Sequence, residues 1–233
     1  LSRGVGRYAN QGVSVQNTTP VQIESSIFWQ NSNVAIQVVS GRAFVSNSVM
    51  VASGDNAYLY LAPTVTNIVG DYNDLYVTGN AIVGSVASLG RNLDSLSAWI
   101  AVCTQETHSL CTDPLFANAE EGDYHLKTQA SQGRFSPSEG NWISDGETSL
   151  LIDSGDPAVP CTNEPAGARI NIGLFGNTPE ASRGRTNVWL AAVGHQAGGW
   201  TRGASPLHWV AFNSTGGCVR VEVSTDGGSE WTV

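Results

Sequence analysis

Residues Ile23–Trp29 (IESSIFW) recur as Val45–Val51 (VSNSVMV) and, in a weaker copy, as Ile68–Asp74 (IVGDYND). The spacing is 22 residues between the first two copies and 23 between the second and the third. A unit of this length cannot bury its own apolar face, so it is stable only when it is stacked on similar units, as in a solenoid. The repeat therefore decides the architecture.

Each unit contains short stretches in which Val, Ile, Phe and Leu alternate with polar residues, as in Gly12–Gln16 and Val21–Ser25. Alternation with a period of two indicates β-strands. Asparagines separate the stretches, and Asn tolerates the left-handed backbone that sharp corners require. They include Asn31, Asn33, Asn47 and Asn56. The chain lacks the regular leucines and helical segments of leucine-rich repeats, so we predict an all-β protein built on a parallel β-helix.

Composition narrows the class of protein. The 233 residues are 41% hydrophobic, which is ample for a core, and only 13% are charged. The net charge of −9, with Lys127 as the one lysine, argues against nucleic-acid binding and against binding to anionic membranes. No run of 18 apolar residues predicts membrane insertion. We therefore expect a secreted or cell-surface protein, and the strand-like sequence at both ends leads us to expect a fragment of a longer chain.

The chain divides into three predicted parts. Residues 1–176 form the β-helix and its terminal cap, 177–187 are a linker, and 188–233 begin a small, truncated β-sandwich-like segment. Within the first part, Leu93–Ile100 predicts one short helix capped by Asp94 or Ser95. After the linker, strands are expected over 189–192, 207–212 and 219–223, followed by a hairpin at Ser224–Trp231 with the pattern of a structural Asp-box.

The four cysteines do not predict a metal site, because they form no CxxC pair and have no histidine partners at zinc spacing. Cys103 and Cys111 are close enough in sequence to form a local disulfide. Two buried free thiols explain them equally well.

An ordered series of segments follows the coils: Asp71–Asp74, the helix around Trp99, Thr107–Leu110, Asp113–Phe116, Asp123–Leu126, Ile152–Pro157 and Arg169–Ser182. Residues 10–185 thereby resemble the C-terminal region of bacterial right-handed parallel β-helix repeat proteins, in the pectate-lyase-like superfamily. The resemblance implies a right-handed solenoid closed by its last coils and their covering loops. It also implies continuation into an immunoglobulin-like or fibronectin-like module, to which the tail from Trp189 is similar. Enzymes of the superfamily act on polysaccharides as lyases, hydrolases or epimerases, in a groove along one face.

Few residues of the coils could perform such chemistry. A uronate lyase must neutralise a sugar carboxylate and remove the neighbouring proton, which needs acidic side chains with calcium and a basic residue. We predict substrate-binding roles for Arg42, Asp55, Tyr58 and Asp71. A structural interpretation of Asp71 competes with this one, because Asp and Asn in such turns often bond their own backbone.

No catalytic residue can be assigned from the sequence. A hydrolase would need two carboxylates, for which Asp55 with Asp71 or Asp74 is the one pair in the coils. His108 and His125 are expected to be structural. We therefore expect catalytic residues, if there are any, on coils before Leu1, and the sequence leaves open whether the protein is an enzyme.

No metal or other cofactor is predicted, with calcium as the alternative. Its ligands would come from Glu120, Glu121 and Asp123, or from Asp153 and Asp156.

Two functions follow from these observations. The first is an extracellular carbohydrate-active protein, a monomer that recognises or degrades a polysaccharide or a surface glycan. The second is a non-catalytic surface or adhesion protein whose β-helix acts as a rigid stalk.

Overall fold

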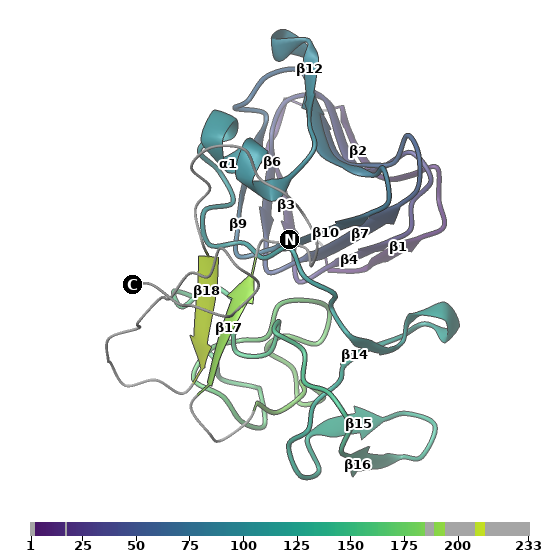
Figure 1. Ribbon diagram of the computed structural model, residues 1–233, viewed down its shortest axis with the longest axis vertical. Helices are drawn as coiled ribbons and strands as arrows, with labels where there is room; N and C mark the ends of the chain where they lie inside the picture. The colour runs from purple at the N-terminus through teal and green to yellow at the C-terminus, as the bar shows by residue number, and fades with distance from the viewer. Residues whose placement is uncertain (1–2, 17, 185–188, 194–207, 213–233) are drawn as a thin grey trace, which may run out of the picture.

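A parallel β-solenoid of about three turns forms the main part of the protein (Figure 1). This computed structural model describes residues 3–16, 18–184, 189–193 and 208–212. Three sheets run along the solenoid, and every neighbouring pair of strands from successive turns is parallel. The prediction of an all-β protein built on a parallel β-helix is confirmed.

Each complete turn contributes one strand to each sheet. The first sheet consists of β1 (Val5–Arg7), β4 (Ile27–Trp29), β7 (Val49–Ser53) and β10 (Asp74–Thr78). The second consists of β2 (Gln11–Gln16), β5 (Val34–Ser40), β8 (Tyr58–Ala62) and β11 (Ile82–Val86), and ends with the antiparallel strand β12 (Arg91–Leu93). The third consists of β3 (Val21–Glu24), β6 (Ala43–Ser46) and β9 (Ile68–Asp71). The incomplete last turn contributes β10 and β11 to the first two sheets.

The elements outside the three sheets are short. The 3₁₀ turn η1 (Ala87–Leu89) precedes β12, and the helix α1 (Leu96–Cys103) follows it. Then come β13 (Phe116–Asn118), the 3₁₀ turn η2 (Ala119–Glu121), β14 (Asp123–Leu126) and the hairpin of β15 (Arg134–Ser136) and β16 (Asn141–Ile143). Among the residues described here, no helix has both the length and the apolar character to cross a membrane.

The last described elements are β17 (Trp189–Val193) and β18 (His208–Phe212), which pair antiparallel. They coincide with two of the strands predicted after the linker and are compatible with a β-sandwich-like segment. The predicted strand over 219–223 and the Asp-box hairpin lie outside the described residues, as does part of the linker.

The register of the third coil corrects the sequence alignment. Ile27 pairs with Val49 at the expected spacing of 22 residues, but Val49 pairs with Asp74, 25 residues later, rather than with Tyr72. The connection between β8 and β9 spans residues 63–67, whereas the equivalent connection in the preceding turn spans only 41–42. The longer turn is closed by hydrogen bonds between Thr64 and Asn67, so it adds residues without changing the strands.

One corner of the solenoid repeats in every turn. Ser25, Asn47 and Tyr72 stand at equivalent places with φ of 45°, 50° and 56°, the left-handed conformation that the asparagines predicted. Asn56 also adopts it, with φ of 59°, but for Asn31 and Asn33 the prediction is wrong: neither has a positive φ, and Gln30 takes the left-handed conformation there, with φ of 50°. Ser25 and Tyr72 adopt the same conformation as Asn47, so the neighbouring turns, and not the residue type alone, impose this backbone.

A ladder of buried polar side chains follows that corner along the solenoid. The backbone N–H of Ser26 donates to Oγ of Ser48 (3.1 Å), the N–H of Ser48 donates to Oδ1 of Asn73 (2.9 Å), and the N–H of Asn73 donates to Oγ of Ser109 (2.8 Å). A buried N–H without a partner is costly, so each side chain satisfies a donor of the preceding coil. The ladder explains why Ser or Asn recurs at this place in the repeat.

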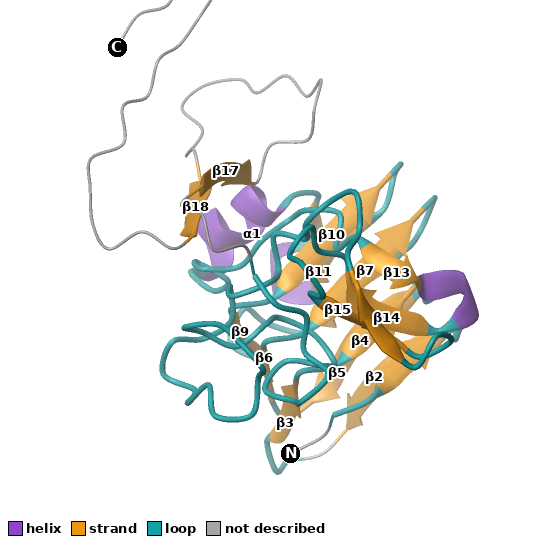
Figure 2. Ribbon diagram, turned by 90° about the horizontal axis from the view of Figure 1, so that it is seen from below, coloured by secondary structure: helices purple, strands orange, loops and turns teal. Residues whose placement is uncertain are grey.

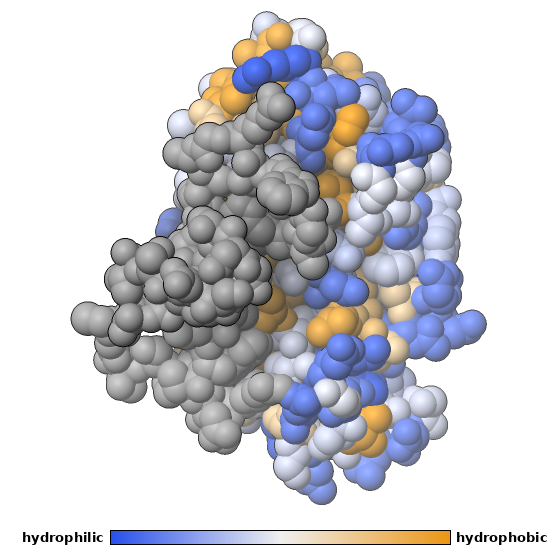
Figure 3. Space-filling model, in the orientation of Figure 1, coloured by the Kyte–Doolittle hydropathy of each residue, from blue (hydrophilic) through white to orange (hydrophobic). Residues whose placement is uncertain are grey.

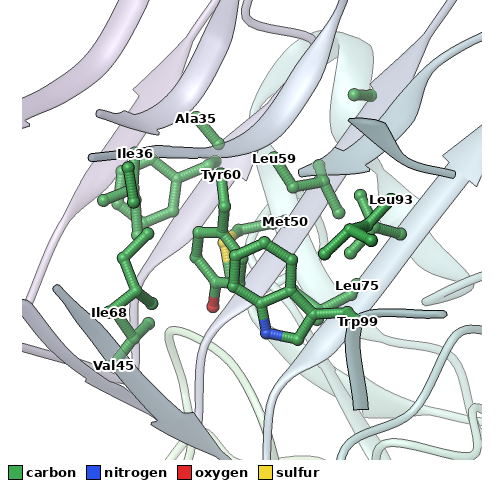
Figure 4. Packing of buried hydrophobic residues seen from close by; sticks show 14 of the residues in the cluster. Ala35, Ile36, Val45, Met50, Leu59, Tyr60, Ile68, Leu75, Leu93 and Trp99 are labelled. Atoms are coloured by element: carbon green, nitrogen blue, oxygen red, sulfur yellow. The ribbon is translucent and has the colours of Figure 1, made fainter. Parts of the chain in front are cut away.

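Aliphatic and aromatic side chains fill the solenoid, as Figure 4 shows around Tyr60 and Met50. Helix α1 closes the end of this core: Leu96, Trp99 and Cys103 are buried, and the rings of Trp99 and Tyr60 lie 5.1 Å apart. The predicted helix is present, shifted by three residues, and Ser95 is its cap, since Oγ of Ser95 accepts the N–H of Ala98.

Residues 110–182 cover the outer face of the β1–β4–β7–β10 sheet and form no further coil. Their apolar side chains pack on Ile27, Val49 and Val51, which point away from the solenoid core. In Figure 2, β13 and β14 lie beside β4 and β7. The covering side chains are Leu110, Phe116, Ala119, Tyr124, Leu126, Leu151, Ile152 and Ile172. We expected these residues to form the last coils and the loops that cover them. The structure contains the covering loops but no further coil over residues 110–182.

The cysteines that the structure describes are free thiols. Cys103 is buried and Cys111 partly buried, which raises the pKa of each thiol to about 11. Of the two alternatives, a disulfide and free thiols, the structure has the second. Cys218 lies outside the described residues.

Candidate functional site

A groove of about 480 Å³ lies on the outer face of the β3–β6–β9 sheet. Side chains alternate along each strand, so Ile23 and Val45 point into the core while their neighbours line the groove. Two rows cross the sheet in register: Gln22, Phe44 and Val69 form the first, and Glu24, Ser46 and Asp71 the second. All of these except Glu24 line the groove.

Two loops form the sides of the groove. One is the wall loop, Thr104–Thr107, which follows α1 and leads to Leu110, where the chain bridges Asp74 of β10. The other carries Asp156, whose backbone N–H donates to Oδ1 of Asn47 (2.8 Å). Tyr72 follows β9 and completes the lining. The groove therefore presents the phenyl ring of Phe44 among hydroxyl, amide and carboxylate groups.

Asp71 fixes the end of the wall loop and His108, the residue that follows it. Its Oδ1 accepts the backbone N–H of His108 (2.7 Å), and its Oδ2 lies 2.7 Å from Nδ1 of His108 and 3.4 Å from Oγ1 of Thr107. The N–H of Tyr72 also donates to Oδ1 (3.1 Å). A carboxylate only accepts, so Nδ1 of His108 carries the proton. With both oxygens engaged, Asp71 acts as a structural support of the groove.

Tyr72 is held from both neighbouring segments. Its ring stacks on the imidazole of His108, with centroids 4.9 Å apart and planes at 4°. The guanidinium of Arg169 lies 5.6 Å from the ring centroid and donates to the carbonyls of Ser154 (3.0 Å) and Gly155. Partial burial, together with Asp71 and Asp156, raises the pKa of Tyr72, so the phenol is neutral at physiological pH. The ring is therefore a rigid, uncharged part of the rim.

Glu106 belongs to the wall loop but points inward. Its carboxylate is fully buried and accepts hydrogen bonds from Tyr60, Asn73 and Ser109. Burial raises its pKa to about 7, although all three partners favour the charged form. A carboxyl group in this position supports the loop from below and is turned away from any ligand in the groove.

The four predicted substrate-binding residues lie in different places. Asp71 lines the groove, whereas Arg42 is in the turn before β6. Asp55 is in the turn between β7 and β8, where its Oδ1 accepts from Nδ2 of Asn80 (2.7 Å). Tyr58, the first residue of β8, is half-buried. Of the four, the groove described above contains Asp71 alone.

Phe44 and the wall loop lie in the groove although the sequence did not single them out, and Asp156, considered only as a calcium ligand, lies there too. Phe44 could have been found from alternation, because it stands between Ala43 and Val45, which face the core. The contributions of the wall loop and of Asp156 depend on how residues after the coils fold back, which the repeat does not encode.

Three of the five acidic groups considered for calcium accept hydrogen bonds from other protein groups, and one of them, Asp156, accepts the backbone N–H of Ala158 through Oδ1 (2.8 Å). Asp123 accepts from the backbone and Nδ1 of His125 and lies 3.8 Å from Arg134, and Glu120 accepts from the hydroxyl of Tyr8. Across the ranges that the structure describes, no three His, Cys, Asp or Glu side chains are grouped as a metal site would require.

Comparisons with known proteins give no assignment: no family model, no curated protein and no solved structure matches this chain.

Proposed function

We propose that this protein is an extracellular carbohydrate-binding protein, secreted or on the cell surface, that holds a polysaccharide chain or surface glycan in the groove on the β3–β6–β9 sheet. The observation that supports it best is Phe44, an aromatic side chain on the outer face of a rigid sheet with polar groups on both sides. The parallel β-solenoid agrees with membership of the pectate-lyase-like superfamily, which is part of the proposal.

The lining suits a sugar chain. A sugar ring has an apolar face that packs on an aromatic ring and hydroxyls that need hydrogen-bond partners. Phe44 and Val69 provide the apolar surface, and Gln22, Ser46 and Gln105 provide donors and acceptors. In Figure 3 polar and apolar side chains are likewise interspersed over the visible surface, without one large apolar patch. The mixed lining of the groove favours a hydrophilic partner over an apolar one.

The groove favours recognition over cleavage. Glycoside hydrolysis needs two carboxyl groups that flank the scissile bond. Both oxygens of Asp71 are engaged by His108, the residue after the wall loop, and Glu106 is turned into the core, which leaves Asp156 as the other carboxylate in the lining. We therefore propose binding without products for these residues, and neutral chains as the preferred ligands, because Asp71 and Asp156 repel uronates.

A non-catalytic stalk is the second candidate. The ladder through Ser26, Ser48 and Asn73 and the layer that covers one sheet both make the solenoid rigid. As a monomeric spacer it would need neither a ligand nor a membrane-inserted segment.

Affinity electrophoresis would separate the two candidates. We would compare hydroxyethyl cellulose with carboxymethyl cellulose, and polygalacturonate with its carboxyl-reduced form, each with and without calcium, while recording reducing-end and unsaturated products. We expect retention by the neutral member of at least one pair and no products. Phe44→Ala should weaken retention about tenfold, equivalent to about 1.4 kcal/mol of ring contact. The control is Val39→Ala, which removes an apolar side chain that is 49% exposed on β5, outside the groove.

Four results would contradict the proposal. Equal retention of wild type and Phe44→Ala would exclude the groove as the site. Calcium-dependent retention of polygalacturonate would contradict the preference for neutral chains, and product formation would show a complete active site. The absence of retention on every polymer would favour the stalk.

A further inference from the structure

The carboxyl group of Glu106 lies where the wall loop meets the end of the solenoid core. Glu106 is 0% exposed, although the loop around it lines the groove. Its backbone N–H donates to the carbonyl of Gly70 (2.8 Å), and a Cβ at position 70 would overlap its carboxylate. Thr104 and Glu106 both have left-handed backbones, with φ of 53° and 61°. The strained loop thus bonds to β9 through the backbone of Glu106 and through Asp71, and it places the ionisable side chain of Glu106 in the core beneath it.

The surroundings of this carboxyl group consist of donors. The hydroxyl of Tyr60 donates to Oε1 (2.7 Å), Nδ2 of Asn73 lies 3.2 Å from Oε1 and 3.0 Å from Oε2, and the hydroxyl of Ser109 donates to Oε2. A protonated carboxyl must itself donate, so one of the two hydroxyls must then reverse and accept. Both protonation states can therefore be hydrogen-bonded, in different arrangements.

Charge and burial act against the donors. Burial, with a smaller contribution from the nearby carboxylate of Asp71 on β9, raises the pKa of Glu106 to about 7. The other titratable group that faces it is Tyr60 on β8, whose own pKa is raised by burial and is far above neutrality. Neither β6 nor α1 contains a charged residue that could face Glu106, and the carbonyl of Val45 on β6 accepts from Asn73.

We propose that Glu106 is a proton-controlled latch of the wall loop. Protonated, it holds the loop docked over Gly70, and ionised, it weakens docking, so the groove is fully formed in mildly acidic solution and loosened in mildly alkaline solution. The consequence for ligand binding rests on the proposed function, whereas the latch itself does not.

The direction follows from proton linkage. The pKa of the docked carboxyl, about 7, is above the ordinary value of 4.5, so the docked loop binds the proton more tightly than the undocked loop. The stabilisation is fully present below the ordinary pKa and is lost as the pH rises through about 7. Between pH 5 and pH 8 the ratio of docked to undocked loop should fall by a factor on the order of tens.

Hydrogen exchange of the segment 100–110, corrected for the intrinsic pH dependence of exchange, tests the latch without a ligand. In the wild type the opening constant should rise by tens of fold from pH 5 to pH 8, and in Glu106→Gln it should be nearly constant. Tyr60→Phe removes a donor to the ionised form, so its transition should move to higher pH, and this variant keeps the test decisive if Glu106→Gln does not fold. His108→Gln is the matched control, because it removes the Nδ1 contact to Asp71 and leaves the carboxyl group of Glu106 in place.

A constant opening constant in the wild type, a pH dependence that survives in Glu106→Gln, or one that disappears in His108→Gln would each overturn the latch. Retention on the neutral polymers at pH 5.5 and pH 8 then tests its consequence. A pH-dependent loop in a protein that retains no polymer would support the latch and refute the proposed function.

Discussion

Replacing Asn73 by alanine tests the buried polar ladder at its most connected point. Asn73 is 0% exposed, and its Oδ1 accepts the N–H of Ser48 (2.9 Å) while Nδ2 donates to the carbonyl of Val45 (3.0 Å) and to Glu106. The substitution leaves a buried N–H and a buried C=O without partners, at about 1–3 kcal/mol each. Together with the lost donor to Glu106, the free energy of unfolding should fall by about 3–6 kcal/mol, a large part of the about 5–15 kcal/mol typical of a domain.

Urea unfolding followed by tryptophan fluorescence and circular dichroism measures this loss. Asn80→Ala is the control, because Asn80 is exposed and makes one surface hydrogen bond, to Asp55; it should change stability by no more than about 0.5 kcal/mol. A loss below about 1 kcal/mol for Asn73→Ala would mean that water or a shifted backbone replaces the ladder, and the reasoning would be refuted.

Three further predictions concern other parts of the fold. Gly84→Ala should lower the free energy of unfolding by about 1–3 kcal/mol, because the new methyl group would overlap the indole of Trp99 on α1. An unchanged Tm in thermal unfolding would contradict the close packing of Trp99 on β11. Asp145→Asn should cost about 1.5–3 kcal/mol at pH 7, since Asp145 accepts from Nε (2.9 Å) and Nη2 (2.8 Å) of Arg134. Burial raises the pKa of Asp145, but the guanidinium of Arg134 outweighs it and the pKa is lowered. The ion pair therefore stabilises the fold above the ordinary carboxyl pKa, and this stabilisation is lost as the pH falls below that value. Identical acid unfolding of wild type and Asp145→Asn would refute this. At pH 8, iodoacetamide should modify Cys161, which is partly exposed, and spare Cys103, whose thiol has a pKa of about 11 and is buried; peptide mass spectrometry with the opposite order would contradict this burial.

The strands of the coils could be predicted because they depend on local alternation. Val45 faces the core and Phe44 the solvent for the same reason, the period of two. The register of the third coil could not be predicted, since the longer turn at 63–67 left the local pattern around Tyr72 looking like the earlier corners. A turn of variable length changes the spacing without changing the alternation.

The candidate site was only partly predictable. Asp71 was selected, but its role as a support depends on His108, 37 residues later, which no pattern in the repeat indicates. Arg42 and Asp55 are charged residues in turns, and the repeat gave no information on which corner of the solenoid each turn occupies. Thr104–Thr107 and Asp156 come after the coils and line the groove, so the site could not be predicted without the path of the chain after the repeat.

The layer of residues 110–182 has a consequence for how this solenoid folds. In a simple array each coil contacts its neighbours alone, so coils can separate one at a time from an end. Here the guanidinium of Arg3 donates to the carbonyl of Gly176 (2.8 Å), and Gly173 and Asp156 bond to Asn47 in the middle of the solenoid. Contacts across up to 173 residues close large loops, which slows folding and makes it depend on late segments of the chain. Pulled from its first strand, the protein should therefore rupture in one cooperative event instead of peeling coil by coil.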